Sequence, residues 1–79
     1  MSKRLTKTLS LVEIFSANLR AARLRGGITQ EELAALAGLH RTYVGSAERG
    51  ERNVTLESVD RLARALRIAP SDLLSGKDS

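Results

Sequence analysis

Apolar residues recur along the chain at the three- and four-residue spacing of a helix face, with polar residues between them. No segment alternates with the period of two that a half-buried strand requires. In the stretch 11–25, the apolar face consists of Leu11, Phe15, Leu19 and Ala22. In the stretch 56–66, the expected inward face consists of Leu56, Val59, Leu62, Ala63 and Leu66. The pattern therefore predicts an all-α fold.

The expected helices carry recognisable end signals. Ser10 precedes Glu13 by three residues, and Thr29 precedes Glu32 in the same way, which is the capping-box pattern of a helix N-terminus. Pro70 suits the first position of a last short helix, because the N–H group that it lacks has no partner there. The signals delimit five helices, at 11–25, 30–37, 41–49, 56–66 and from Pro70 to about residue 75.

The second and third of these helices are joined by a turn of about three residues centred on Gly38. So short a link prevents the two helices from lying antiparallel, and they are expected to cross steeply as a helix-turn-helix. Gly38 is expected at positive φ, and Ala34 supplies the small side chain needed where the two backbones approach. His40 is expected to cap the helix 41–49, which is the candidate recognition helix.

The first residues of a recognition helix face base edges in the major groove of DNA. Arg41 is expected to read a guanine through O6 and N7, and the alternative is an Arg that touches only phosphate. Thr42 is expected to contact a base, and the alternative is that it fills the first helical turn. Tyr43 is expected to contact the sugar–phosphate backbone, and the alternative is packing in the core. Ser46 is expected one turn further on the DNA-facing side, and the alternative is a small spacer. Gln30 is expected to donate its amide to a phosphate.

Length and charge narrow the class of protein. Seventy-nine residues correspond to one domain, with a basic, flexible tail expected at 1–9 and a folded region at 10–76. Thirteen Lys and Arg residues against nine Asp and Glu give a net charge of +4. Ten of the thirteen are Arg, which suits phosphate and guanine contacts, although a solubilising surface is the alternative. The tail either reaches the DNA or makes no contact with it.

Several functional classes find no support in the residues. The chain has no cysteine and a single histidine, so no metal site and no cofactor are expected. No apolar run reaches the ~18 residues that a membrane span needs, so no membrane partner is expected. No nucleophile–base pair or glycine-rich phosphate loop indicates an enzyme. A chain of this length has no room for a separate effector domain, so no small-molecule effector is expected.

The stretch 30–49 resembles the helix-turn-helix of Xre-type regulators, the superfamily of the lambda repressor and Cro, through the sequence TQEELAALAGLHRTYVGSAERGERN. Within that superfamily, the run GLHRTYVGSAERGERNVTL resembles the controller proteins of restriction–modification systems. Those are small dimeric activator-repressors. The resemblance covers about residues 11–75 and implies a five-helix, lambda-repressor-like DNA-binding domain.

The resemblance also implies roles for residues outside the first turn of the recognition helix. Arg49, Arg52 and Asn53 match the loop that clamps the DNA backbone in the family. Arg23 and Glu48 match a pair of residues that form a structural ion pair, which would link the helix 11–25 to the recognition helix.

Dimerisation is a further implication, because the family dimerises through its C-terminal elements. Ile68, Leu73 and Leu74 offer more apolar surface than a short last helix can bury by itself, and Pro70 stiffens the chain beside them. We therefore expect these four residues at a homodimer interface. Arg67 stands where the family usually has Gly, so the geometry of the turn at this position is left open.

The sequence therefore predicts a transcription regulator that binds double-stranded DNA sequence-specifically, as a dimer on a palindromic operator. It is expected in the bacterial cytoplasm, associated with the nucleoid. The alternative is a protein-interaction module of the same fold, such as a coactivator or an antitoxin-like adaptor, that lacks specific DNA binding.

Overall fold

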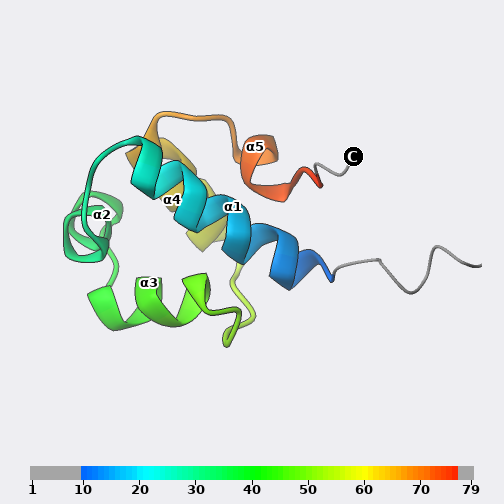
Figure 1. The fold of residues 1–79 in the computed structure, drawn as a ribbon. Helices are drawn as coiled ribbons and strands as arrows, with labels where there is room; N and C mark the ends of the chain where they lie inside the picture. Colours follow the sequence, from blue (N-terminus) through cyan, green and yellow to red (C-terminus); the bar gives the residue numbers. More distant parts are fainter. Residues whose placement is uncertain (1–9, 77–79) are drawn as a thin grey trace, which may run out of the picture.

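The computed structural model describes residues 10–76, in which the chain forms five helices and no strand (Figure 1). The helices are α1 (Leu11–Arg25), α2 (Gln30–Ala37), α3 (Arg41–Glu48), α4 (Leu56–Leu66) and α5 (Pro70–Leu74). The predicted all-α fold is confirmed, and every helix begins at the predicted residue. The third and fifth helices end about one residue earlier than expected. The predicted basic tail at 1–9 lies outside the described residues.

Local side-chain bonds explain where the first helices begin. The Ser10 hydroxyl accepts a hydrogen bond from the Glu13 N–H group at 3.1 Å, and the Glu13 carboxylate accepts one from the Ser10 N–H group at 2.8 Å. Thr29 and Glu32 form the same reciprocal pair at the start of α2. His40 occupies the corresponding backbone position before α3, but its side chain makes no capping bond, contrary to expectation. The start of α3 therefore lacks the side-chain acceptor that α1 and α2 have.

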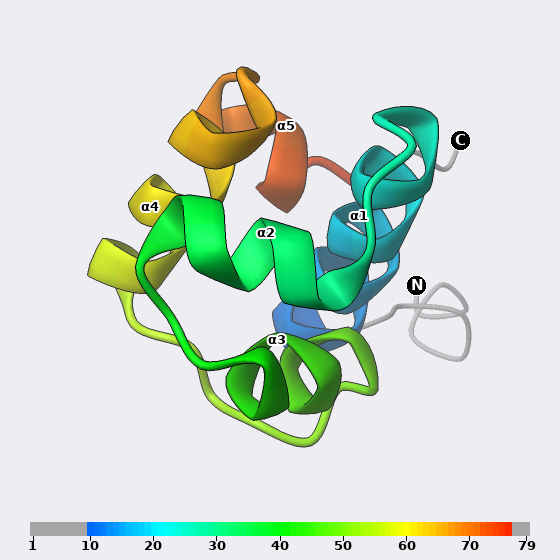
Figure 2. The ribbon, with the colours of Figure 1, turned by 90° about the vertical axis from the view of Figure 1, so that its left-hand side faces the viewer.

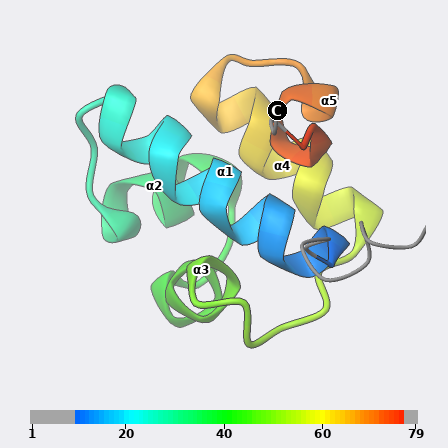
Figure 3. The same ribbon diagram turned by 45° about the vertical axis from the view of Figure 1, so that its right-hand side comes forward.

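All five helices contribute to one apolar core. The largest fully buried side chains are Phe15, Leu19, Leu33, Val44, Leu62 and Leu73. Helix α2 packs against both α3 and α4, and α5 packs against α1 and α4 (Figure 2). Seen from three directions, α3 and α5 lie at opposite ends of the molecule (Figure 3). The surface around α3 is therefore remote from the C-terminal helix.

The predicted inward face of α4 is wrong at its first residue. Val59 and Leu62 are buried as expected, whereas the Leu56 residue is 82% exposed. Leu11, at the start of α1, is also exposed. Both residues belong to the first turn of a helix, and the rest of the described chain does not cover that turn. The helical periodicity is correct, but it does not indicate where the neighbouring helices end.

The chain turns sharply after α2 and after α4 through residues with positive φ. Gly38 has a φ of 72°, as predicted, and lets the Leu39 N–H group bond to the Ala34 carbonyl at 2.9 Å. Arg67 has a φ of 61°, and no other non-glycine residue among residues 10–76 lies in this region. The Ile68 N–H group bonds to the Ala63 carbonyl at 3.0 Å, so the C-terminus of α4 keeps the usual cap although glycine is absent.

A buried ion pair connects α1 to α3. The Arg23 guanidinium donates to the Glu48 carboxylate through Nε at 2.6 Å and through Nη2 at 3.0 Å. Its Nη1 donates to the Ile28 carbonyl at 3.0 Å, and the Gln30 amide donates to the same Glu48 carboxylate at 3.0 Å. The Arg23 and Glu48 side chains are only 10% and 3% exposed. Helix α3 is therefore tied to α1, to the α1–α2 turn and to α2 by one set of directional bonds.

The surroundings of Glu48 favour its charged form. Burial by itself would raise the pKa of the carboxyl, because it removes water from the charge. Hydrogen bonds from Arg23 and Gln30, together with the positive charges of Arg23 and Arg20, outweigh that effect and hold the pKa of Glu48 below its ordinary value. The pKa of Arg23 is raised in turn, chiefly by its hydrogen bond to Glu48.

Removing the charge of Glu48 is expected to weaken the fold substantially. The variant Glu48→Gln leaves the buried Arg23 without a counter-charge, and we expect the free energy of unfolding to fall by about 3 kcal/mol. Urea denaturation followed by circular dichroism measures this change. As a control, Asp60→Asn removes the exposed partner of Arg64 on α4 and should change stability by less than about 0.5 kcal/mol. Equal losses for the two variants would contradict the structural role of the ion pair.

The same variants give a pH dependence with a definite sign. The pKa of Glu48 is lower in the folded state than its ordinary value of 4.5. The stabilisation from its charge is therefore complete above that value and is lost as the pH falls through the folded-state pKa. On acidification from about pH 6 to about pH 3, the wild type should lose more unfolding free energy than Glu48→Gln. If the wild type and Glu48→Gln lost the same unfolding free energy over this pH range, a group other than Glu48 would dominate acid unfolding.

Relieving the positive φ at Arg67 is expected to stabilise the protein. In this region the Cβ of an ordinary residue is strained, so Arg67→Gly should raise the free energy of unfolding by about 1 kcal/mol. For a domain of this size, the melting temperature should rise by roughly 4–8 °C, measured by circular dichroism. The matched control Arg64→Gly introduces the same residue inside α4, where it should lower stability by about 1 kcal/mol. A decrease in both variants would contradict the strain at Arg67.

Candidate nucleic-acid interface

Helix α3 lies at the surface and exposes one side of its first turn (Figure 2). Val44 and Ala47 are buried against the core, whereas Arg41 and Thr42 are exposed. The position of α3 follows from the turn at Gly38 and from the close packing of α2, in which Ala34 is buried as predicted. The predicted helix-turn-helix is therefore present, with the second helix accessible from outside.

Arg41 is free to reach a ligand. Its side chain is 70% exposed, and its guanidinium lies 3.8 Å from the Glu31 carboxylate, which is also mostly exposed. An exposed pair at this distance contributes little to stability, because water and salt screen it. The side chain can therefore exchange Glu31 for another acceptor without a large penalty.

Gln30 points toward α3 rather than away from the protein. Its amide nitrogen donates to Glu48, and its amide oxygen lies near Gly45, where an added Cβ would be 3.3 Å away. Gln30 is half-buried and braces the recognition helix through its bond to Glu48. The phosphate contact expected from its amide remains a prediction.

Tyr43 combines a structural contact with a surface position. The residue is half-buried, and its hydroxyl donates to the Ser58 hydroxyl at 3.0 Å. Ser58 in turn accepts a hydrogen bond from Thr55 at 3.1 Å. The Arg52 guanidinium carbon lies 4.7 Å from the centre of the Tyr43 ring, within the range of a cation–π contact. Packing of Tyr43 against the protein is thus compatible with the predicted contact to the DNA backbone.

Ser46 does not lie on the exposed side of α3, which is a correction to the sequence analysis. The residue is only 7% exposed. Its hydroxyl donates to the Tyr43 carbonyl at 3.0 Å and accepts from Arg52 Nε at 2.9 Å. The loop that follows α3 turns back over Ser46, and periodicity within a helix carries no information about that loop. Ser46 is therefore a contact of Arg52 and not an exposed base reader.

The loop between α3 and α4 presents Arg49, Arg52 and Asn53, which are all exposed. Arg49 pairs with Glu51 at 3.1 Å, and both side chains are more than half exposed. Arg52 lies over the ring of Tyr43 in the first turn of α3. We call the exposed arginines of α3 and this loop, Arg41, Arg49 and Arg52, the cationic surface. Sequence reasoning missed the contact between Ser58 and Tyr43, because the two residues lie fifteen positions apart and no local pattern links them.

Not all of the residues expected at a dimer interface are exposed on the surface. Leu73 is completely buried, so its predicted role is wrong: the side chain fills the core between α5 and the helices beneath it. Ile68 and Leu74 are partly buried, and Pro70 is exposed. Sequence reasoning missed an apolar hollow of about 150 Å³ at the N-terminal ends of α1 and α4. It is lined by Leu11, Val12, Phe15, Asn53, Val54, Leu56, Val59 and Leu74.

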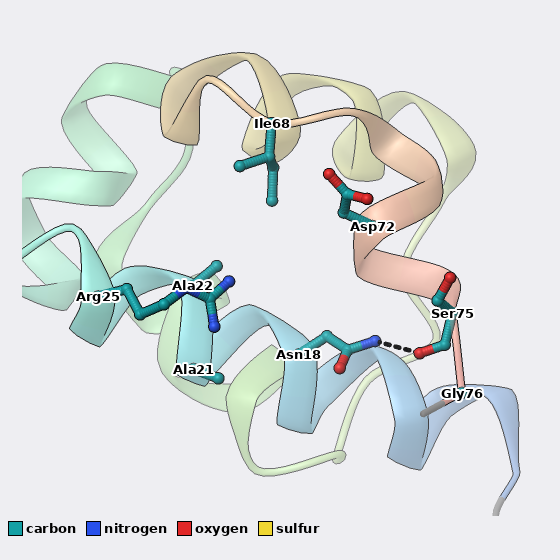
Figure 4. Close-up of a pocket in the computed structure, with 8 residues that line it drawn as sticks. All are labelled: Asn18, Ala21, Ala22, Arg25, Ile68, Asp72, Ser75 and Gly76. Atoms are coloured by element: carbon teal, nitrogen blue, oxygen red, sulfur yellow. Dashed lines mark hydrogen bonds between the residues drawn. The ribbon is translucent and has the colours of Figure 1, made fainter. Parts of the chain in front are cut away.

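A second hollow, of about 440 Å³, lies between α1 and α5 with the residues on either side of α5 (Figure 4). Asn18 borders it and donates to the carbonyl groups of Leu73 and Ser75, at 2.9 Å each. These bonds fasten the end of α5 to α1. The hollow lies on the side of α1 away from α3 and takes no part in the candidate interface. Among residues 10–76, no three His, Cys, Asp or Glu side chains are grouped as metal ligands.

In the described part of the chain, none of the helices combines the length and the apolar character needed to traverse a lipid bilayer. The surface around α3 carries exposed arginines at the start of the helix and in the loop that follows it. Such groups suit phosphate oxygens and the guanine edge in the major groove of DNA.

Comparison with known proteins agrees with this geometry. A helix-turn-helix family model matches residues 19–73. The control protein C.SmaI of Serratia marcescens is 46% identical over 67 residues, which are 85% of this chain and 80% of the relative. The control protein C.BamHI of Bacillus amyloliquefaciens is 42% identical over 62 residues, covering 77% and 76% of the two chains.

Solved structures show the same architecture. The restriction–modification controller protein C.AhdI from Aeromonas hydrophila is 48% identical, with a TM-score of 0.77 over 78% of this chain and 94% of its own. The hypothetical transcription factor NHTF from Neisseria is 38% identical, with a TM-score of 0.83 over 86% and 78% of the two chains. The family consists of transcription regulators and not of enzymes. The chain therefore belongs to the helix-turn-helix family of DNA-binding transcription regulators.

Proposed function

We propose that this protein is a controller-type regulator that binds a palindromic operator as a homodimer in the bacterial cytoplasm. The observation that carries the proposal is the exposed first turn of α3, with Arg41 and Thr42 accessible beside a loop that presents Arg52. Similarity to the control proteins C.SmaI and C.BamHI supports the controller assignment. Residues 10–76 would then supply both the DNA-binding surface and the dimer contacts.

The proposed contacts divide into base reading and backbone positioning. Arg41 reads a guanine through two parallel hydrogen bonds, and Thr42 contacts the neighbouring base. The residues that grip the sugar–phosphate backbone are Gln30, Tyr43, Arg49, Arg52 and Asn53. Since α3 starts without a side-chain cap, its first N–H groups are also suited to an anionic oxygen.

A single recognition helix gives limited specificity, and a symmetric dimer reads two half-sites about 34 Å apart. We propose that the dimer forms through the Leu56 patch, which consists of Leu11, Val12, Val54, Leu56 and Leu74. The apolar lining of the hollow there and the strong exposure of Leu56 support this choice over the core residue Leu73. Ile68 and Pro70 are then peripheral to the contact.

The alternative of a protein-interaction module without specific DNA binding finds less support. That alternative does not require exposed Arg side chains both at the start of α3 and in the following loop. It also predicts no dependence of binding on salt concentration, whereas contacts with phosphates release counterions and make DNA affinity fall steeply as salt rises.

Substitutions of Arg41 and Arg52 are expected to affect DNA binding in different ways. Arg41→Ala should lose about 1–3 kcal/mol of binding free energy per half-site on the operator and little on scrambled DNA, because it removes base reading. Arg52→Ala should weaken binding to both DNAs and reduce the slope of log affinity against log salt by about 1. Fluorescence anisotropy at two salt concentrations measures both effects, on an operator first selected from random DNA.

The matched control is Arg64→Ala, which removes the same charge from the exposed side of α4. It should leave operator affinity nearly unchanged. Equal losses for Arg41→Ala on operator and scrambled DNA would refute base reading by Arg41. A wild-type protein that selects no preferred sequence from the random pool would refute the proposed function itself.

Introducing a charge into the Leu56 patch is expected to produce a folded monomer. Leu56 is exposed and is the first residue of α4, so Leu56→Glu is compatible with the monomer fold and with the helix dipole. Analytical ultracentrifugation should show the loss of the wild-type dimer. The control Leu36→Glu places the same charge on α2, at a residue that is 64% exposed, and should remain dimeric. A dimeric Leu56→Glu variant would show that the interface lies elsewhere.

A further inference from the structure

A continuous set of polar contacts supports Arg52 from beneath. Ser46 donates its hydroxyl hydrogen to the Tyr43 carbonyl, which leaves the lone pairs of its oxygen free to accept from Arg52 Nε. The Tyr43 ring lies under the guanidinium and is itself held by the bond from its hydroxyl to Ser58. The Arg52 guanidinium is therefore fixed at two points, one on its edge and one on its face.

These contacts leave the outer part of the guanidinium available. Ser46 uses only Nε of Arg52, and among residues 10–76 neither terminal nitrogen has a hydrogen-bond or ion-pair partner. Arg52 as a whole is exposed. A long, exposed side chain would otherwise sample many rotamers, and fixing it upon binding lowers affinity. A hydroxyl that fixes the side chain beforehand removes part of that loss.

We propose that Ser46 is a positioning residue that pre-organises Arg52 for the DNA backbone and so raises operator affinity without touching DNA itself. This inference rests on the proposed function, because it assumes that Arg52 contacts the duplex. It assigns a role in binding to a buried hydroxyl that lies behind the DNA-facing surface. Ser58 contributes indirectly to the position of Arg52, because it holds the Tyr43 ring on which the guanidinium rests.

The test is a double-mutant cycle on the full chain and the selected operator. Ser46→Ala removes one hydroxyl and should weaken operator binding by about threefold to tenfold. In the background of Arg52→Ala, the same change should alter affinity by less than about twofold, because the side chain that Ser46 holds is gone. The control Ser16→Ala removes a similarly buried hydroxyl that bonds only within α1 and should leave affinity unchanged in both backgrounds.

A second measurement on the free protein keeps the inference independent of operator binding. In the wild type, the Arg52 Nε–H group should give a resolved NMR signal that is protected from exchange with water, and Ser46→Ala should abolish that protection. Thermal unfolding of each variant verifies that the fold persists.

Three results would overturn the inference while leaving the proposed function intact. One is an equal loss of operator affinity from Ser46→Ala with and without Arg52, which would mean that Ser46 acts through the fold. The second is no loss in either background. The third is an Arg52 Nε–H group that exchanges freely in the wild type. Failure of the wild type to bind any selected DNA would instead refute the proposed function, and this inference with it.

Discussion

The orientation of α3 depends on the buried ion pair between Arg23 and Glu48. Helix α3 has only eight residues and cannot fix its own direction. Its apolar contacts are not directional, whereas the two bonds between guanidinium and carboxylate are. Gln30 adds a third bond to the same carboxylate from the first residue of α2. The two helices of the motif are therefore held to α1 and to each other at a single carboxylate.

Once α3 is fixed, the loop that follows it joins two surfaces of different chemistry. In the middle of the loop, Arg52 rests on Tyr43, which belongs to the first turn of α3. Its next residue, Asn53, borders the apolar hollow at Leu11 and Leu56. The cationic surface and the apolar patch thus share one short segment. In the proposed dimer, this segment would connect the subunit contact to the contact with the DNA backbone.

The residues of the candidate site were predicted with uneven success, and the reasons are physical. Arg41 and Thr42 were placed correctly on the surface, because they lie on the side of α3 opposite its buried residues Val44 and Ala47, and that side follows from helical periodicity. Ser46 was placed on the wrong side, because its environment is set by Arg52, six residues later and across a loop. Leu73 was assigned to the surface although it is buried, because the depth of the core under α5 depends on helices distant in sequence.

The sequence alone determined the five helices, the residues at which they begin and the turn of the helix-turn-helix, because these features depend on residues close together in the chain. Capping boxes and the positive φ of Gly38 are local in this sense. Only the tertiary structure decided that Leu56 is exposed, that Ser46 is buried, and that Arg67 adopts a left-handed conformation without glycine. The first two depend on how segments distant in the chain pack, which leaves no periodic signal in the sequence. The cap at Arg67 is local, but an Arg residue carries no sequence signal for a positive φ.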